Sequence, residues 1–178
     1  MKKSTIKNIV VNAMGIALFV VLSLCLQVPV FQNYYLCLGY VAMTVFCYSI
    51  STISGTLSGT IGVIIYCLII NGLRGMPGWA IGNLFLGILM GITFKLVKKI
   101  NKPIIETIIS SIVIIAGTAI AMLVIKSSVE CLLYSQPFMV RAATNIYAFV
   151  ADAFVIIASL PICRILEPHI NKILKKIA

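Results

Sequence analysis

The chain contains few charged residues and very few acidic ones. Only 10% of its 178 residues are charged, with four Asp and Glu against 14 Lys and Arg, whereas 61% are hydrophobic. The mean hydropathy is +1.14. A soluble domain covers its surface with roughly 25% charged residues. The composition therefore excludes a soluble protein and indicates an integral membrane protein.

Motifs for catalysis and for metal binding are also missing. The lone histidine, His169, follows the last apolar run, and the six cysteines include no C-x-x-C pair. Gly55–Gly62 is rich in glycine but lacks the lysine of a P-loop, which excludes ATP hydrolysis by that route. We therefore expect no enzymatic activity, no metal and no cofactor. A disulfide between Cys37 and Cys131 stays open, because Cys37 falls at the outer end of a predicted span and Cys131 falls in an outer loop on the same side.

Long apolar runs predict six membrane-spanning helices in a single domain, residues 1–178. A span needs roughly 17 to 25 apolar residues. Pro29 ends the first run, and the Ser51–Gly55 stretch divides a longer apolar segment in two. The predicted helices cover about residues 9–28, 36–51, 55–70, 78–97, 104–125 and 140–166. The expected fold class is an all-α six-helix membrane bundle.

The basic residues give the orientation of these spans. With six spans, all but three of the 14 Lys and Arg fall on one side of the membrane, the exceptions being Arg74, Lys126 and Arg141. Basic residues are enriched in cytoplasmic segments. We therefore expect both termini in the cytoplasm and a multi-pass protein of the cell membrane, in contact with the lipid bilayer. The basic clusters lie between apolar runs without interleaved aromatic residues, so we expect no nucleic-acid partner.

Polar side chains inside a span point to a partner or a ligand, because an unpaired polar group in lipid is costly. Asp152 lies near the middle of the sixth predicted helix, and Arg141 and Asn145 share its face at 100° per residue. Arg141 and Asp152 are about 16 Å apart along the helix, too far to pair directly. Asp152 is interpreted either as a tie to Ser and Thr of neighbouring helices or as a ligand contact.

An irregular outer segment precedes the fourth predicted helix. Residues 71–79 combine three glycines, one proline, Arg74 and the only tryptophan, Trp79. Trp79 and Asn83 are four residues apart and share a helix face. Trp79 is either a membrane-interface residue or an aromatic plate above an amide. A small-molecule site is typically an apolar cavity with a few convergent polar groups, and here it is expected to open to the outside.

The first predicted helix carries two small residues four apart, in the segment Ala13-Met14-Gly15-Ile16-Ala17. Together with six short spans, a glycine-rich third span and a structured outer loop, this segment resembles the substrate-binding S components of energy-coupling factor (ECF) vitamin transporters. The resemblance covers essentially the whole chain. It implies that Ala13 and Ala17 dock onto the membrane coupling subunit, which works with two ATPase subunits.

The resemblance also implies a ligand site on the outer side, for which the residues named above are candidates by location. They are Arg74, Trp79, Asn83, Arg141, Asn145 and Asp152. The ligand stays open between an anionic vitamin such as pantothenate and a flat heterocycle such as riboflavin, a pyridoxine-type compound or a queuosine-type base. An autonomous small carrier or channel is the alternative. Such a protein often shows an internal repeat or ion-coupled charges, and no convincing repeat is found here.

Overall fold

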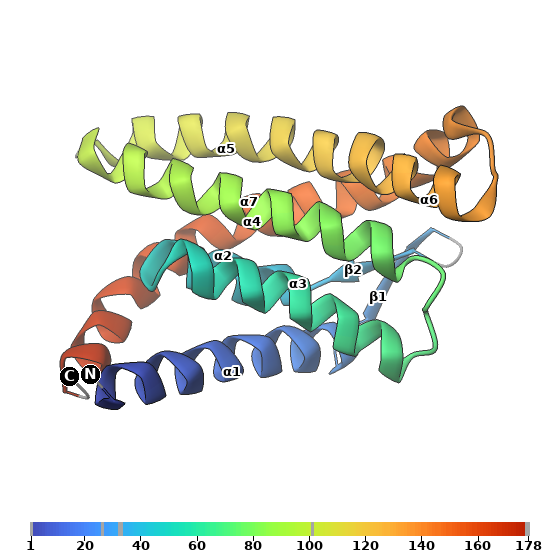
Figure 1. Cartoon of the computed structure of the whole chain (residues 1–178). Helices are drawn as coiled ribbons and strands as arrows, with labels where there is room; N and C mark the ends of the chain where they lie inside the picture. Colours follow the sequence, from blue (N-terminus) through green and yellow to red (C-terminus); the bar gives the residue numbers. More distant parts are fainter. Residues whose placement is uncertain (1, 26, 32–33, 101, 177–178) are drawn as a thin grey trace.

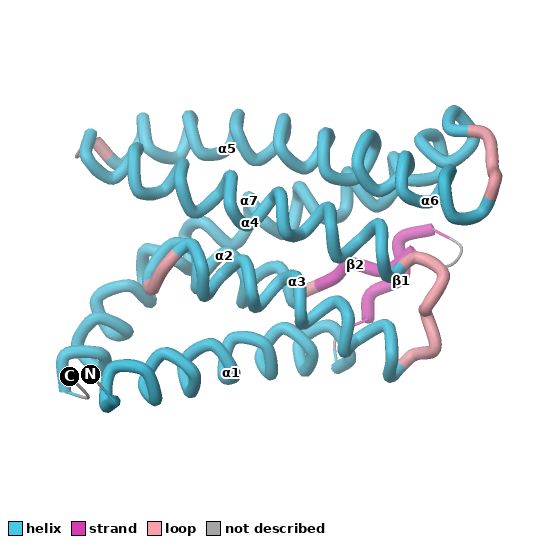
Figure 2. The backbone as a smooth tube through the Cα atoms, viewed as in Figure 1, coloured by secondary structure: helices cyan, strands magenta, loops and turns pink. Residues whose placement is uncertain are grey.

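The computed structural model describes the chain except residues 1, 26, 32–33, 101 and 177–178. Helices run back and forth along one axis, and a small β-hairpin lies at one end (Figures 1 and 2). The elements are α1 (Lys2–Cys25), β1 (Gln27–Phe31), β2 (Tyr34–Cys37), α2 (Gly39–Ser49), α3 (Thr52–Ile69), α4 (Met76–Val97), a 3₁₀ turn η1 (Lys98–Ile100), α5 (Pro103–Ala119), a π-helical segment η2 (Ile120–Lys126), α6 (Ser127–Tyr134) and α7 (Phe138–Lys176).

The two ends of this bundle differ. The chain termini lie side by side at one end, which we call the terminal end, and the hairpin, α6 and the α3–α4 loop lie at the other, the hairpin end (Figure 1). Lys7 Nζ donates a hydrogen bond of 2.9 Å to the Leu174 carbonyl, which ties the first helix to the last. Because both chain termini lie at the same end, the chain passes along the bundle axis an even number of times.

Five helical segments are long and apolar enough to cross a membrane, among the residues that the structure describes. They are Ile6–Cys25, Thr52–Ile69, Met76–Ile100, Pro103–Tyr134 and Phe138–Lys175. The prediction of an all-α membrane protein is therefore confirmed. With 11 residues, α2 is too short to cross alone. Together with β2 it spans about 30 Å, the thickness of a bilayer core, so six crossings stay a prediction.

The predicted boundaries of the first two spans are wrong. Helix α1 ends at Cys25, and Gln27–Phe31 form β1, in which Gln27 pairs with Cys37 and Val28 with Leu36 of β2. Helix α2 begins only at Gly39. Hydropathy alone does not distinguish an apolar strand from an apolar helix. The β-branched valines on both sides of Pro29 favour a strand, and proline stops a helix.

The later helices begin close to their predicted starts, but the last two helical runs extend well beyond their predicted ends. Ser51 caps α3 by accepting a 3.0 Å hydrogen bond from the Ser54 amide, so the predicted break is confined to residues 50–51. The fifth helical run continues through η2 and α6 to Tyr134, beyond the predicted residue 125. Helix α7 continues to Lys176 although it contains two prolines.

Small residues bring the central helices close together, as the four-residue glycine spacing predicts. A Cβ on Gly87 of α4 would lie 2.7 Å from Thr56 Cα of α3, and one on Gly59 would lie 2.2 Å from Met43 Sδ of α2. The core between the helices contains large, fully buried side chains, including Phe19, Met43, Leu86, Met90 and Ile156. Isoleucine, leucine and valine side chains cover much of the outer surface, as expected for helices that face lipid.

Ion pairs and hydrogen bonds join the helices at the terminal end. Lys98 pairs with Glu167, and Arg164 Nη2 lies 3.6 Å from Glu106 Oε2. The Tyr48 hydroxyl donates a 2.7 Å hydrogen bond to Glu106. Two of the four acidic residues of the chain, Glu106 and Glu167, thus form contacts at the terminal end. The other two, Glu130 and Asp152, lie toward the hairpin end.

Candidate functional site

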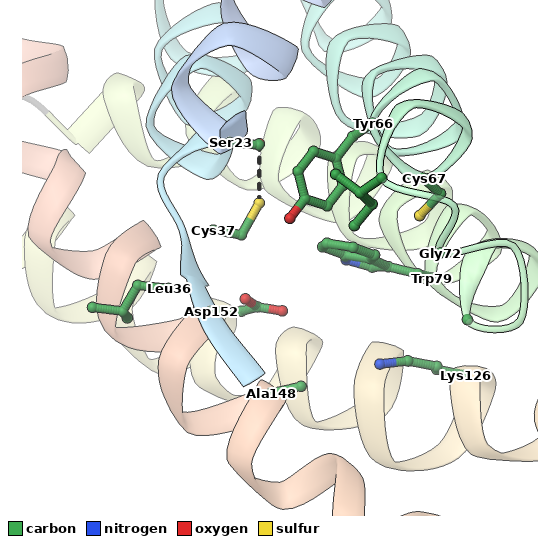
Figure 3. Close-up of a pocket in the computed structure, with 12 residues that line it drawn as sticks. Ser23, Leu36, Cys37, Tyr66, Cys67, Gly72, Trp79, Lys126, Ala148 and Asp152 are labelled. Carbon is green, nitrogen blue, oxygen red and sulfur yellow. Dashed lines mark hydrogen bonds between the residues drawn. The ribbon is translucent and has the colours of Figure 1, made fainter. Parts of the chain in front are cut away.

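A partly enclosed cavity of about 220 Å³ lies at the hairpin end of the bundle (Figure 3). Its walls come from α1, β2, the end of α3, the α3–α4 loop, the first turn of α4, η2 and α7. The lining residues are Ser23, Leu36, Cys37, Tyr66, Cys67, Ile70, Gly72, Gly75, Trp79, Lys126, Ala148 and Asp152. Segments far apart in the sequence therefore form one site.

Two aromatic rings form one wall of the cavity. The rings of Tyr66 and Trp79 lie 5.8 Å apart between centroids and almost perpendicular, at 88°. The loop between their helices makes this pairing possible. Asn71 adopts a left-handed backbone with φ 58°, which asparagine tolerates, and the Gly72 amide donates a 2.8 Å hydrogen bond to the Cys67 carbonyl. The chain therefore turns within a few residues and returns as α4.

Two buried charges lie on the opposite side of the cavity (Figure 3). Lys126, the last residue of η2, is 9% exposed, and Asp152 of α7 is 4% exposed. Among the described residues neither forms an ion pair within 4.0 Å. The Asp152 carboxyl lies next to the Tyr40 hydroxyl, and Lys126 Nζ lies 5.9 Å from the centre of the Trp79 ring. The cavity thus offers an amine, a carboxyl group and an aromatic face to a ligand.

Arg141, Asn145 and Asp152, which were predicted to share one face of the last helix, lie in two different environments. Asp152 lines the cavity, whereas Asn145 is 1% exposed and donates hydrogen bonds to Ser127 Oγ at 3.0 Å and to Glu130 Oε2 at 3.2 Å. Arg141 Nε lies 3.9 Å from the same Glu130 oxygen. Arg141 and Asn145 therefore hold Glu130 between α6 and α7 and are outside the described lining of the cavity.

The two remaining candidates also lie outside this lining. Arg74 is exposed in the α3–α4 loop, with its Cζ 5.5 Å from the centre of the Tyr134 ring. Asn83 is fully buried and bonded to Tyr40 and to the Gly59 carbonyl. Of the six predicted ligand residues, the structure brings Trp79 and Asp152 together in the cavity. Ligand contacts of all six, including Arg74, Asn83, Arg141 and Asn145, remain predictions.

Comparison with known proteins decides the family. The model of the family described as ECF-type riboflavin transporter, S component, matches residues 3–167. The chain belongs to this family. No curated protein and no solved structure matches it. As an S component, it is a substrate-binding subunit of an ECF transporter and a multi-pass membrane protein, and the family is not one of enzymes. The resemblance in the first helix, spans and outer loop is thus confirmed at family level.

Several residues of this S component's cavity were not predicted from the sequence. Lys126 was interpreted only as an outer basic residue. It reaches the cavity at the end of η2, where the wider π-helical turn changes which residues face the bundle. Tyr66 and Cys67 occur in an apolar run without a distinguishing pattern.

Cys37 is a buried free thiol 3.3 Å from Ser23 Oγ, and Cys131 is also free, so no disulfide joins them.

Proposed function

We propose that the cavity captures riboflavin, or a flavin closely related to it, for ATP-driven uptake. The family description supports the ligand class. The observation that carries the proposal is an aromatic wall in one cavity with two buried ionisable side chains, Lys126 and Asp152, which form no ion pair within 4.0 Å among the described residues. Buried charges destabilise a membrane helix bundle unless something compensates them. A bound ligand that hydrogen-bonds both groups provides that compensation.

The chemistry of the flavin ring suits this arrangement. Its flat tricyclic system stacks on aromatic side chains such as Trp79. Its imide edge carries carbonyl oxygens that accept hydrogen bonds and an N–H group that donates one. Lys126 supplies donors and an ionised Asp152 supplies acceptors. Pantothenate has no flat ring for the aromatic wall, and this disfavours it relative to the other vitamins considered from the sequence.

The size of the cavity limits how the ligand sits. A volume of about 220 Å³ is below the roughly 300 to 1,000 Å³ of sites for drug-sized molecules. In our proposal the ring system occupies the space beside Trp79, and the polar ribityl tail extends past Gly72 and Gly75. The two glycines have no side chains to obstruct this path.

We further propose that the hairpin end faces the exterior and the terminal end the cytoplasm. The end of α4, the start of α5 and the end of α7 lie at the terminal end (Figure 1), and these segments and the turn between α4 and α5 carry Lys95, Lys98, Lys99, Lys102, Lys172, Lys175 and Lys176. Cytoplasmic enrichment of basic residues supports this orientation. It includes six crossings, the second made by β2 and α2 together, and it opens the cavity to solutes outside the cell.

Docking onto the coupling subunit is proposed for the exposed face of α1. Ala13 and Ala17 are both exposed there, and Met14, Leu18 and Val21 lie beside them with 45–57% of their surface exposed. Gly15, between the two alanines, instead packs against the Phe46 ring. Small residues on an apolar helix face permit close approach of a partner helix. The two ATPase subunits then act through the coupling subunit.

The ligand can be identified directly. The protein is purified in detergent from cells grown with riboflavin, and the small molecules released by denaturation are identified by mass spectrometry. We expect riboflavin or a derivative of it. Recovery of a different vitamin in stoichiometric amount would contradict the proposed ligand. Uptake of riboflavin into liposomes by this chain alone, without ATP, would instead favour an autonomous carrier.

A further inference from the structure

A hydrogen-bonded relay leads from the cavity wall into the core of the bundle. Trp79 Nε1 donates to the Tyr40 hydroxyl at 2.7 Å, and that hydroxyl donates to Asn83 Oδ1 at 2.8 Å. Asn83 Nδ2 in turn donates to the Gly59 carbonyl at 3.0 Å. Tyr40 and Asn83 are each 0% exposed. The relay joins α4, α2 and α3, and only Trp79 of these residues lines the cavity.

The direction of every bond in this relay is determined by its two ends. The indole N–H of Trp79 can only donate, and the Gly59 carbonyl can only accept. The Asn83 amide must therefore turn its NH₂ group to Gly59 and its oxygen to Tyr40. The single hydrogen of the Tyr40 hydroxyl then goes to Asn83, with the Asp152 carboxyl as the other neighbouring acceptor, while its oxygen accepts from Trp79. Reversing any one bond leaves a buried group unpaired, which is costly.

The inner end of the relay is held firmly. Gly59 lies where α2 and α3 approach so closely that a Cβ would be 2.2 Å from Met43 Sδ. The Tyr40 ring packs edge-on against the buried Phe19, with centroids 5.9 Å apart. Gly59 thus lies at a close helix contact, and the tyrosine ring is fully enclosed by protein. The position of the Trp79 indole therefore depends on the packing of three helices.

We propose that Tyr40 and Asn83 are positioning residues that set the orientation of Trp79 and thereby the affinity for the ring of the ligand. They act without touching the ligand, since neither lines the described cavity. This inference rests on the proposed function for its ligand. Its structural part, the control of the Trp79 indole, is independent of what binds.

The first test uses Trp79 as its own probe, because it is the only tryptophan in the chain. In ligand-free protein, Tyr40→Phe removes the acceptor of the indole N–H. We expect a shifted emission maximum and easier quenching by acrylamide. Tyr48→Phe is the matched control, since Tyr48 is on the same helix but bonds to Glu106 at the terminal end. Unchanged emission and quenching in Tyr40→Phe would overturn the relay, whether or not riboflavin binds.

The second test measures riboflavin affinity in a double-mutant cycle. We expect Tyr40→Phe to weaken binding about tenfold, because the indole and the Asn83 oxygen both lose a buried partner. In a Trp79→Phe background the same change should have little further effect, because the indole N–H is already absent. An equal loss in both backgrounds would overturn the proposal, since Tyr40 would then act on Asp152 or on packing alone.

A second variant guards against misfolding of the first. Asn83→Leu keeps a similar volume and removes both amide bonds, which leaves the Tyr40 hydroxyl without its acceptor. We expect it to change Trp79 quenching and riboflavin affinity in the same direction as Tyr40→Phe. Thermal unfolding of each variant identifies the ones that fold. Wild-type emission and affinity in a folded Asn83→Leu protein would contradict the role assigned to Asn83.

Discussion

Lys126 and Asp152 line the same cavity from different helices, both more than nine-tenths buried, and neither forms an ion pair within 4.0 Å in the described part of the chain. Charges in a low-dielectric interior are destabilising unless their partners are close and well oriented. Here both groups line one cavity. This relationship is the main reason to regard the cavity as a binding site and not as a packing defect.

The two buried groups should therefore lower the stability of the ligand-free protein and raise its affinity for the ligand. In the double variant Lys126→Met and Asp152→Asn, riboflavin affinity should fall at least tenfold, because hydrogen bonds to charged groups contribute about 1.5–3 kcal/mol. The unfolding temperature of the ligand-free protein should stay the same or rise, since buried charges are removed together. Fluorescence titration and thermal unfolding in detergent measure the two effects.

The control for this pair is Lys98→Met. Lys98 pairs with Glu167 at the terminal end of the bundle, whereas the cavity lies at the hairpin end. Its removal should lower the unfolding temperature and leave riboflavin affinity unchanged. If the double variant instead kept wild-type affinity, the ligand would bind elsewhere.

Trp79 should contribute mainly through its aromatic face. Trp79→Ala should weaken riboflavin binding by about ten- to a hundredfold, because stacking of a base on an aromatic ring is worth about 1–3 kcal/mol. Trp79→Phe keeps a face and should retain part of the affinity. Isothermal titration of both variants tests this. Equal affinities of the two variants would mean that the ring does not stack on the ligand.

The exposed alanines of α1 should affect transport and not binding. In Ala13→Leu and Ala17→Leu, ATP-dependent uptake with the coupling subunit and ATPases should fall strongly, because a larger side chain prevents close helix approach. Riboflavin binding by the isolated chain should be unchanged. Ala143→Leu is the matched control, since Ala143 is an exposed alanine of α7. Loss of binding in the α1 variants would place these alanines in internal packing.

The orientation in the membrane is tested with cysteines in a background without the native ones. Cysteines at Lys7 and Leu174 should be joined by a bifunctional thiol reagent about as long as a lysine side chain, since Lys7 Nζ lies 2.9 Å from the Leu174 carbonyl oxygen. In intact cells both should be protected from a membrane-impermeant thiol reagent, while a cysteine at Arg74 should react. Labelling of Lys7 from outside would contradict the cytoplasmic position of the termini.

Sequence patterns predicted the parts of the fold that depend on hydrophobicity and side-chain size. Long apolar runs give membrane helices, and the glycine pairs of α3 and α4 give close packing. The hairpin was missed because a short strand and a helix have the same apolar composition. The π-helical segment η2 was missed because it reflects packing of the folded bundle and leaves no clear local pattern.

The site was only partly predictable for the same reason. A tryptophan after an irregular loop and an acid inside a span both stand out in an apolar sequence, and Trp79 and Asp152 do line the cavity. Asn83 was expected beneath Trp79 on one helix face, but Tyr40 of α2 lies between the two polar groups. No pattern within one helix indicates a side chain that enters from another.

Titration of riboflavin into the purified chain, in detergent and without any partner subunit, tests the central claim most directly. We predict that flavin fluorescence is quenched, that binding saturates at one riboflavin per chain, and that the Lys126→Met and Asp152→Asn double variant loses this binding while remaining folded. A folded wild-type chain that leaves flavin fluorescence unchanged would contradict the account.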